Sequence, residues 1–165
     1  MEQDADGNWN VVLPEMAPGF RIYSFVVDGE SYMDPGSRPF FMGGYASAIE
    51  YPDPYGGFHQ PRPVPHGDVR EHWFYSEVTG SYRRMFVYTP PAYEHDTDTR
   101  YPVLYLQHGG GEIESEWTHS GRANFILDNL IALGLARPMI IVMNNGFVTR
   151  AGGPDDGPRG YGPGF

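Results

Sequence analysis

The sequence predicts an α/β fold on the evidence of three patterns in its second half. Two apolar runs, at 102–107 and 139–143, enclose a segment from 121 to 133 in which apolar residues recur every three or four positions. That spacing is typical of the buried side of a helix. Two strand-like segments, at 69–75 and 82–88, precede these runs. We therefore expect an antiparallel hairpin followed by one right-handed strand–helix–strand unit.

The individual segments carry their own signals. Gly80 lies between the first two strands and can supply the positive φ that a hairpin turn needs. The run at 102–107 is apolar on both faces, which is typical of a central strand covered by helices on both sides. Gly134 should end the helix, and Pro138 follows shortly after. From Val148 onward Gly, Pro and Asp dominate, and no core-forming pattern remains.

The first fifty residues have a different pattern. Apolar and polar residues alternate around Trp9, Val11 and Leu13 and again from 20 to 26, with turn residues between them, as in short antiparallel strands. These strands are fewer than the roughly seven of a β-sandwich. Residues 51–67 are rich in Pro and Gly and predict a stiff connector. We expect a partial β-sandwich module at 1–50, a linker at 51–67 and the α/β part at 68–165.

Composition excludes several classes of function. The formal net charge is −10 and the sequence has no Lys, so nucleic acid is not an expected partner. The absence of Cys removes disulfides, thiolate nucleophiles and cysteine-bound zinc. No apolar run approaches about 18 residues, and the first ten residues are polar and acidic, so neither a membrane span nor an export signal is expected.

The motif at 108–111 is the most informative one. It consists of His108, Gly109, Gly110 and Gly111, directly after an apolar strand and ahead of a helix. Glycines let backbone N–H groups approach a substrate closely, and this pattern after the third strand forms the oxyanion hole of α/β-hydrolases. We assign Gly110 and Gly111 to the oxyanion hole and His108 and Gly109 to positioning of the loop. An ordinary glycine-rich turn stays an alternative.

A phosphate-binding loop is the other alternative for the glycine motif. A Walker loop requires Gly-Lys-Ser or Gly-Lys-Thr after the glycines, whereas Glu112 follows here. The sequence therefore favours the oxyanion role over the phosphate role.

The catalytic serine of such a hydrolase is missing from the sequence. It would lie in Gly-x-Ser-x-Gly, after the oxyanion strand and before the acid and the histidine of the triad. None of the serines is in that frame, and only Ser115 and Ser120 follow the glycine loop. We expect the whole triad beyond Phe165 and no catalytic residue in this chain.

Other polar residues are weaker candidates. The histidines show no metal-binding spacing, so no metal site is expected. Alternating Glu112, Glu114 and Glu116 are more typical of a solvated loop than of an acid–base pair. Trp117 can stack on a substrate ring, or belong to the core. Asn145 follows the second parallel strand, at the edge where ligands bind, although a tight turn is the simpler interpretation.

The segments 65–71, 83–91, 101–111 and 124–130 together resemble the esterase D-like family of feruloyl and acetylxylan esterases. The resemblance covers 65 to about 147 and implies the α/β-hydrolase fold. It also implies a serine esterase that releases ferulate or acetate from plant cell-wall polysaccharide without a cofactor or metal, and secretion or a periplasmic location. Enterochelin-type esterases share the layout and stay an alternative.

The segment from Trp9 to Pro35 resembles the back part of an early-set immunoglobulin-like module, related to glycogen-binding modules. The chain therefore resembles a fragment shortened at both ends, which predicts self-association through uncovered sheet edges. A non-catalytic carbohydrate-binding or scaffold fragment is the competing function.

Overall fold

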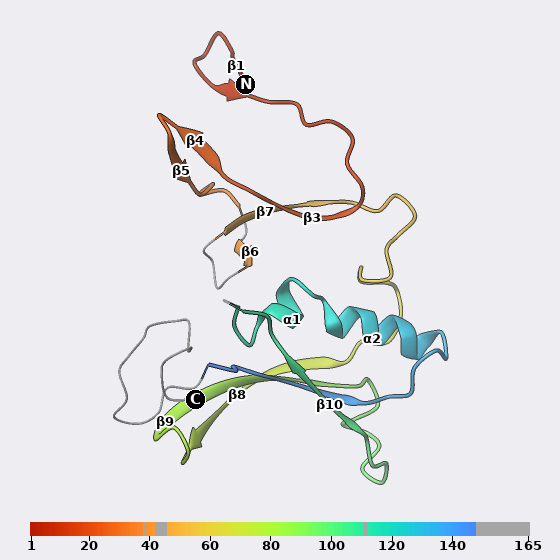
Figure 1. Ribbon diagram of the computed structural model, residues 1–165. Coiled ribbons are helices and arrows are strands. Elements are labelled where there is room, and N and C mark those ends of the chain that lie inside the picture. Colours follow the sequence, from red (N-terminus) through yellow and green to blue (C-terminus); the bar gives the residue numbers. More distant parts are fainter. Residues whose placement is uncertain (38, 42–45, 111, 148–165) are drawn as a thin grey trace.

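The computed structural model describes residues 1–37, 39–41, 46–110 and 112–147. In Figure 1 the short strands of the first third lie at one end, a larger sheet lies at the other, and two helices lie between them. The front strands are β1 (Glu2–Gln3), β2 (Trp9–Asn10), β3 (Gly19–Tyr23), β4 (Phe25–Val27), β5 (Glu30–Tyr32), β6 (Pro39–Phe41) and β7 (Ala46–Tyr51). The back part contains β8 (Asp68–Ser76), β9 (Ser81–Thr89), β10 (Val103–Gln107), α1 (Glu116–His119), α2 (Ala123–Ala132) and β11 (Ile140–Asn144).

The back sheet has the strand order β10-β11-β9-β8. Strands β8 and β9 form the predicted antiparallel hairpin, and Gly80 in its turn has a φ of +64°. Strands β10 and β11 are parallel, with α1 and α2 in the connection between them. The predicted strand–helix–strand unit is thus present, and Gly134, with a φ of +69°, follows the end of α2.

The prediction that the run at 102–107 is a central strand is wrong. Strand β11 inserts between β9 and β10, which leaves β10 at the edge of the sheet. Val103 and Tyr105 are 47% and 71% exposed. An apolar run shows that a strand can be buried on both faces, but it does not say which strands of the chain flank it.

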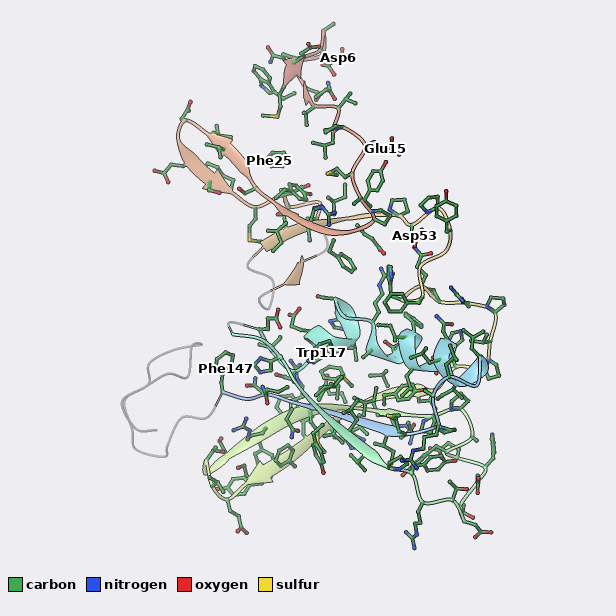
Figure 2. All side chains as sticks on the ribbon, turned by 45° about the vertical axis from the view of Figure 1, so that its right-hand side comes forward. Asp6, Glu15, Phe25, Asp53, Trp117 and Phe147 are labelled. Carbon is green, nitrogen blue, oxygen red and sulfur yellow. The ribbon has the colours of Figure 1, made fainter. Side chains whose placement is uncertain are left out.

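The core lies between the sheet and α2, on one face of the sheet. It consists of five buried side chains: Tyr88, Ala123, Leu127, Ile141 and Met143. Tyr88 of β9 is paired with Ile141 of β11, so their side chains point to the same face. The helical repeat in α2 places Ala123 and Leu127 on the side that meets them. In Figure 2 side chains from both elements fill the space between α2 and the sheet.

The front strands form three separate small sheets. β1 pairs with β2, β4 pairs with β5, and β3, β7 and β6 make a three-stranded antiparallel sheet. The predicted strand around Val11 and Leu13 is wrong, since both lie outside the strands and are 56% and 51% exposed. Their alternation has no neighbouring strand to pair with. The resemblance to an immunoglobulin-like module stays a prediction.

The linker is fastened to α2 by a group of buried polar contacts that we call the α2 clasp. The carboxylate of Asp128 accepts hydrogen bonds from the Tyr88 hydroxyl (2.6 Å) and the Gly67 N–H (2.9 Å), and it contacts His66 Nδ1 at 2.8 Å. The next residue, Asn129, donates to two backbone carbonyls of the linker, those of Phe58 and Gln60. The Pro- and Gly-rich linker is therefore held against the helix by hydrogen bonds.

Candidate functional site

The candidate site lies where β10 and β11 end. Parallel strands present their carboxyl ends at the same edge of a sheet, and Gln107 and Asn144 are paired there. His108, Gly109 and Gly110 follow β10, and Asn145 follows β11. The structure thus brings four of the six predicted site residues to one edge. Gly111 lies outside the described residues.

His108 ties the two loops together. Its Nε2 accepts a hydrogen bond from the N–H of Gly146 at 2.9 Å. Since an amide N–H can only donate, the imidazole proton must be on Nδ1, which lies 2.8 Å from the carbonyl oxygen of Gly109. The ring also packs against Phe147, with ring centroids 5.2 Å apart. Neutral His108 therefore fixes the glycine loop to the loop after β11, as a positioning residue would.

Gly109 and Glu112 close the glycine loop on itself. The Gly109 N–H donates to the Glu112 carboxylate at 2.7 Å, and the Glu112 N–H donates to the Gly109 carbonyl at 3.2 Å. A Cβ on Gly109 would lie 3.0 Å from the same carboxylate, which favours glycine there. Because the Gly109 N–H is engaged, it is unsuited to bind an oxyanion. The assignment of Gly110 as an oxyanion donor stays a prediction.

Trp117 supports the end of β10. Its indole Nε1–H donates to the carbonyl oxygen of Gln107 at 2.8 Å, and the side chain lies between α1 and the sheet in Figure 2. Gly121 lies close against the indole, since a Cβ there would be 2.8 Å from Trp117 Cε3. These contacts position the residue before His108. The role of Trp117 in stacking on a substrate stays a prediction.

A buried ion-pair network that sequence reasoning missed lies beside these loops. Glu114, only 4% exposed, accepts a hydrogen bond from Arg84 Nε through one carboxylate oxygen and from Asn145 Nδ2 (2.7 Å) through the other. Arg83 donates to the backbone carbonyl of Asn145, whose side-chain oxygen accepts from the Phe147 N–H at 2.9 Å. The carbonyl oxygen, the side-chain nitrogen and the side-chain oxygen of Asn145 therefore all have hydrogen-bond partners, which fix the loop after β11.

The electrostatics of Glu114 exclude an acid–base role at neutral pH. Burial by itself would raise the pKa of this carboxyl. Hydrogen bonds from its own backbone N–H, from Arg84 and from Asn145, together with the Arg84 charge, nevertheless hold the pKa of Glu114 below its ordinary value. The carboxylate is therefore ionised and structural. The carboxylates of Glu112 and Glu116 also accept hydrogen bonds, from the Gly109 N–H and from the Ser120 hydroxyl respectively.

The hairpin β8–β9 extends past the end of β11 and forms one wall of a cleft beside the site. The cleft has a volume of about 420 Å³. Its lining comes from the hairpin and from the loops described above: Trp73, Thr79, Ser81, Tyr82, Arg83, Arg84, Glu114, Asn145 and Phe147. A ligand reaching the loop after β11 can therefore extend along the hairpin.

The described part of the chain contains no group of three or more His, Asp or Glu side chains placed to hold a metal ion. Within the same residues, no helix has the length and apolarity needed to span a membrane.

Comparison with known proteins identifies relatives of the chain. A family model described as "Putative esterase" matches residues 76–159. A curated endo-1,4-beta-xylanase/feruloyl esterase of Xylanibacter ruminicola is 39% identical over 155 residues, which is 90% of this chain and 21% of that protein. Endo-1,4-beta-xylanase Y of Acetivibrio thermocellus is 32% identical over 99 residues, covering 59% of this chain and 9% of that protein. The chain spans at most about a fifth of these two relatives.

A solved structure shares the fold. The CE1 ferulic acid esterase of the anaerobic fungus Anaeromyces mucronatus superposes with a TM-score of 0.54 and 31% identity, over 67% of this chain and 41% of that one. A second structure of that esterase, described as a complex with ferulic acid, gives the same TM-score and identity. The α/β-hydrolase fold expected from the sequence is thereby confirmed, together with the resemblance to feruloyl esterases.

Proposed function

This chain belongs to the "Putative esterase" family, and on that premise we propose that it forms the oxyanion-binding part of a serine carboxylic-ester hydrolase. The observation that carries the proposal is the position of the glycine loop. It follows β10 directly, and the hydrogen bond from the Gly146 N–H to His108 connects it to the loop after β11. Such a fixed loop can hold backbone N–H donors in place before the reaction begins.

The proposed chemistry is acyl transfer. A serine attacks the ester carbonyl, and a negative charge develops on the carbonyl oxygen. The backbone N–H groups of Gly110 and Gly111 are the proposed donors that stabilise this charge. No serine of this sequence lies in the Gly-x-Ser-x-Gly frame. The proposal therefore assigns the triad to a part of the protein outside these 165 residues and gives this chain the work of positioning.

The proposed substrates are ferulate or acetate esters on plant cell-wall polysaccharide. Support comes from the relative whose name pairs endo-1,4-beta-xylanase with feruloyl esterase and from the structure described as a complex with ferulic acid. Acyl transfer through a serine nucleophile, as proposed, requires no cofactor or metal. A secreted or periplasmic location would give such an enzyme access to its polymer.

The oxyanion assignment is tested in a protein extended through the nucleophile segment, with methyl ferulate as substrate. Gly110→Pro removes the N–H donor, whereas Gly110→Ala keeps it and serves as the matched control. We expect the proline variant to lower kcat about 100- to 1000-fold, and the alanine variant to have a much smaller effect. Hydrolysis by the 165-residue chain alone, abolished by a serine-directed inhibitor, would contradict the proposal, as would full activity of the proline variant.

The edge strand β10 motivates a further proposal, that the 165-residue chain self-associates. Val103, Leu104 and Tyr105 are exposed on this edge, and an exposed apolar strand edge is a template for pairing with another chain. Size-exclusion chromatography should show dimers or larger species. A monomer at all accessible concentrations would argue against this role of β10.

A further inference from the structure

The free end of the β8–β9 hairpin carries exposed aromatic residues on one face. Trp73, Tyr75 and Tyr82 are 61%, 56% and 72% exposed. The strand register pairs Trp73 with Arg84 and Tyr75 with Tyr82, so these four side chains share one face of the sheet. Tyr88, four residues after Arg84 on the same strand, belongs to the core under α2. The aromatic surface is therefore the continuation of the helix-covered face beyond the helices.

This surface borders the cleft of about 420 Å³ described above. Trp73 and Tyr82 line it from the hairpin, whereas Glu114, Asn145 and Phe147 line it from the loops of the candidate site. Phe147 also packs against His108, so the cleft adjoins the glycine loop. Its volume falls within the range of about 300–1000 Å³ that is usual for small-molecule sites.

The Arg84 charge at the cleft is already paired. The Arg84 guanidinium contacts the carboxylates of Glu114 and, at 3.7 Å, of Glu71, and it lies 5.7 Å from the centre of the Trp73 ring. Arg83 donates to the Asn145 carbonyl. An anionic ligand would meet Arg84 already paired and the buried carboxylate of Glu114 beside it, which favours an uncharged ligand next to Trp73.

The remaining lining combines aromatic rings with hydroxyl groups. Thr79 and Ser81 place two hydroxyls 3.0 Å apart at the tip of the hairpin, and Trp73 and Tyr82 offer exposed ring surface. The two hydroxyls hydrogen-bond to each other, and together they keep one further O–H donor and several acceptor lone pairs for a ligand. A sugar ring fits both features, because its C–H face stacks on an aromatic ring while its hydroxyls hydrogen-bond at the rim.

We propose that the cleft between the β8–β9 hairpin and the loop after β11 is a subsite for a neutral sugar chain. The choice of β-linked xylose as that sugar rests on the proposed function, in which the ester is carried by a xylan-type polymer. A sugar held at Trp73 and Tyr82 would present its attached ester toward the glycine loop. The hairpin would then select esters on a polymer over small free esters.

The test is an NMR titration of the 165-residue chain with xylohexaose. We expect saturable binding with a Kd of about 1 mM or tighter. Trp73→Ala and, independently, Tyr82→Ala should each weaken binding about tenfold, because each removes one stacking surface. Tyr82 supports no residue of the core, so its variant keeps the test informative if Trp73→Ala fails to fold. Trp9→Ala is the matched control, since Trp9 is 64% exposed and lies in β2.

Three results would overturn the proposal. They are no saturable binding of xylohexaose, equal affinity in wild type and both hairpin variants, and tighter binding of inorganic phosphate than of xylohexaose. Methyl ferulate carries no sugar, so its hydrolysis by the extended protein reports the proposed function separately. Hydrolysis without xylohexaose binding would refute the subsite alone, and Trp73-dependent binding without hydrolysis would refute the esterase proposal alone.

Discussion

The front and back parts of the chain both contain antiparallel strand pairs, but they differ in how their strands are covered. In the back part, β9 and β11 place Tyr88, Ile141 and Met143 against α2, and these side chains are 0–3% exposed. In the front part Ile22 of β3 and Val26 of β4 are 61% and 62% exposed. A strand pattern therefore produces a core only where a second layer, here a crossover helix, covers the sheet.

The contacts within the back part also differ from the contacts that connect the front part to it. The back part is held by apolar packing, whereas the front part reaches it through polar contacts with α2 and its N-terminus. Glu50 at the end of β7 forms an ion pair with Arg122, whose guanidinium lies 5.4 Å from the centre of the Phe20 ring. The α2 clasp holds the linker in the same way. Substitutions in the core should therefore change the stability of the back part, whereas substitutions in the α2 clasp should change how firmly the front part is attached.

The largest effect is expected from Asp128→Ala. Asp128 is 1% exposed, and its removal leaves the buried Tyr88 hydroxyl and the Gly67 N–H without their acceptor. We expect the free energy of unfolding to fall by about 3–5 kcal/mol. Urea denaturation followed by circular dichroism measures it.

Two further variants sharpen that result. Asp98→Ala, at an exposed position, should change the free energy of unfolding by less than about 0.5 kcal/mol. Tyr88→Phe in the Asp128→Ala background removes the unpaired hydroxyl and should recover part of the loss. If Asp128→Ala proves as mild as Asp98→Ala, the clasp does not join helix and linker in solution.

Leucines in the two parts provide a direct comparison of their packing. Leu127 of α2 is 6% exposed, whereas Leu13 of the front part is 51% exposed. Leu127→Ala should lower the free energy of unfolding by about 2–4 kcal/mol because it opens a cavity in the core. Leu13→Ala should cost less than about 0.5 kcal/mol. Equal losses in the same denaturation experiment would show that the front part has a packed core of its own.

The sequence predicted those elements whose signals are local. The hairpin with Gly80 and the helix ended by Gly134 were both found within a few residues, because turns and periodic stripes are encoded in adjacent positions. The placement of His108 and Gly109 at the end of β10 followed from the same local reasoning.

The features that the sequence did not predict depend on contacts between distant residues. Glu114 meets Arg84 and Asn145 across 30 and 31 positions, and only the insertion of β11 beside β9 brings the three together. The edge position of β10 has the same origin. The burial of Asp128 had only a weak signal in the sequence. It is a charged residue next to Leu127, on a helix that is predicted from the spacing of its apolar residues.

The smallest effect is expected from the pH dependence of His66 in the α2 clasp. Its ring nitrogens face two acceptors, with Nδ1 2.8 Å from the Asp128 carboxylate and Nε2 2.9 Å from the Arg62 carbonyl. A neutral imidazole can donate to one of them and the imidazolium to both. The hydrogen bond to Asp128, with a further contribution from Arg62, raises the pKa of His66 above its ordinary value against a smaller opposing effect of burial.

A raised pKa in the folded state means that protonation of His66 stabilises the fold. That stabilisation is complete below the unfolded pKa of about 6.5 and is lost as the pH rises through the folded-state pKa. The side chain is 38% exposed, so solvent weakens the effect. Urea denaturation of wild type and His66→Gln between about pH 5.5 and 8.5 should show the wild-type advantage shrinking as the pH rises. An advantage independent of pH would mean that His66 holds the linker as a neutral ring, which donates to only one of its two acceptors.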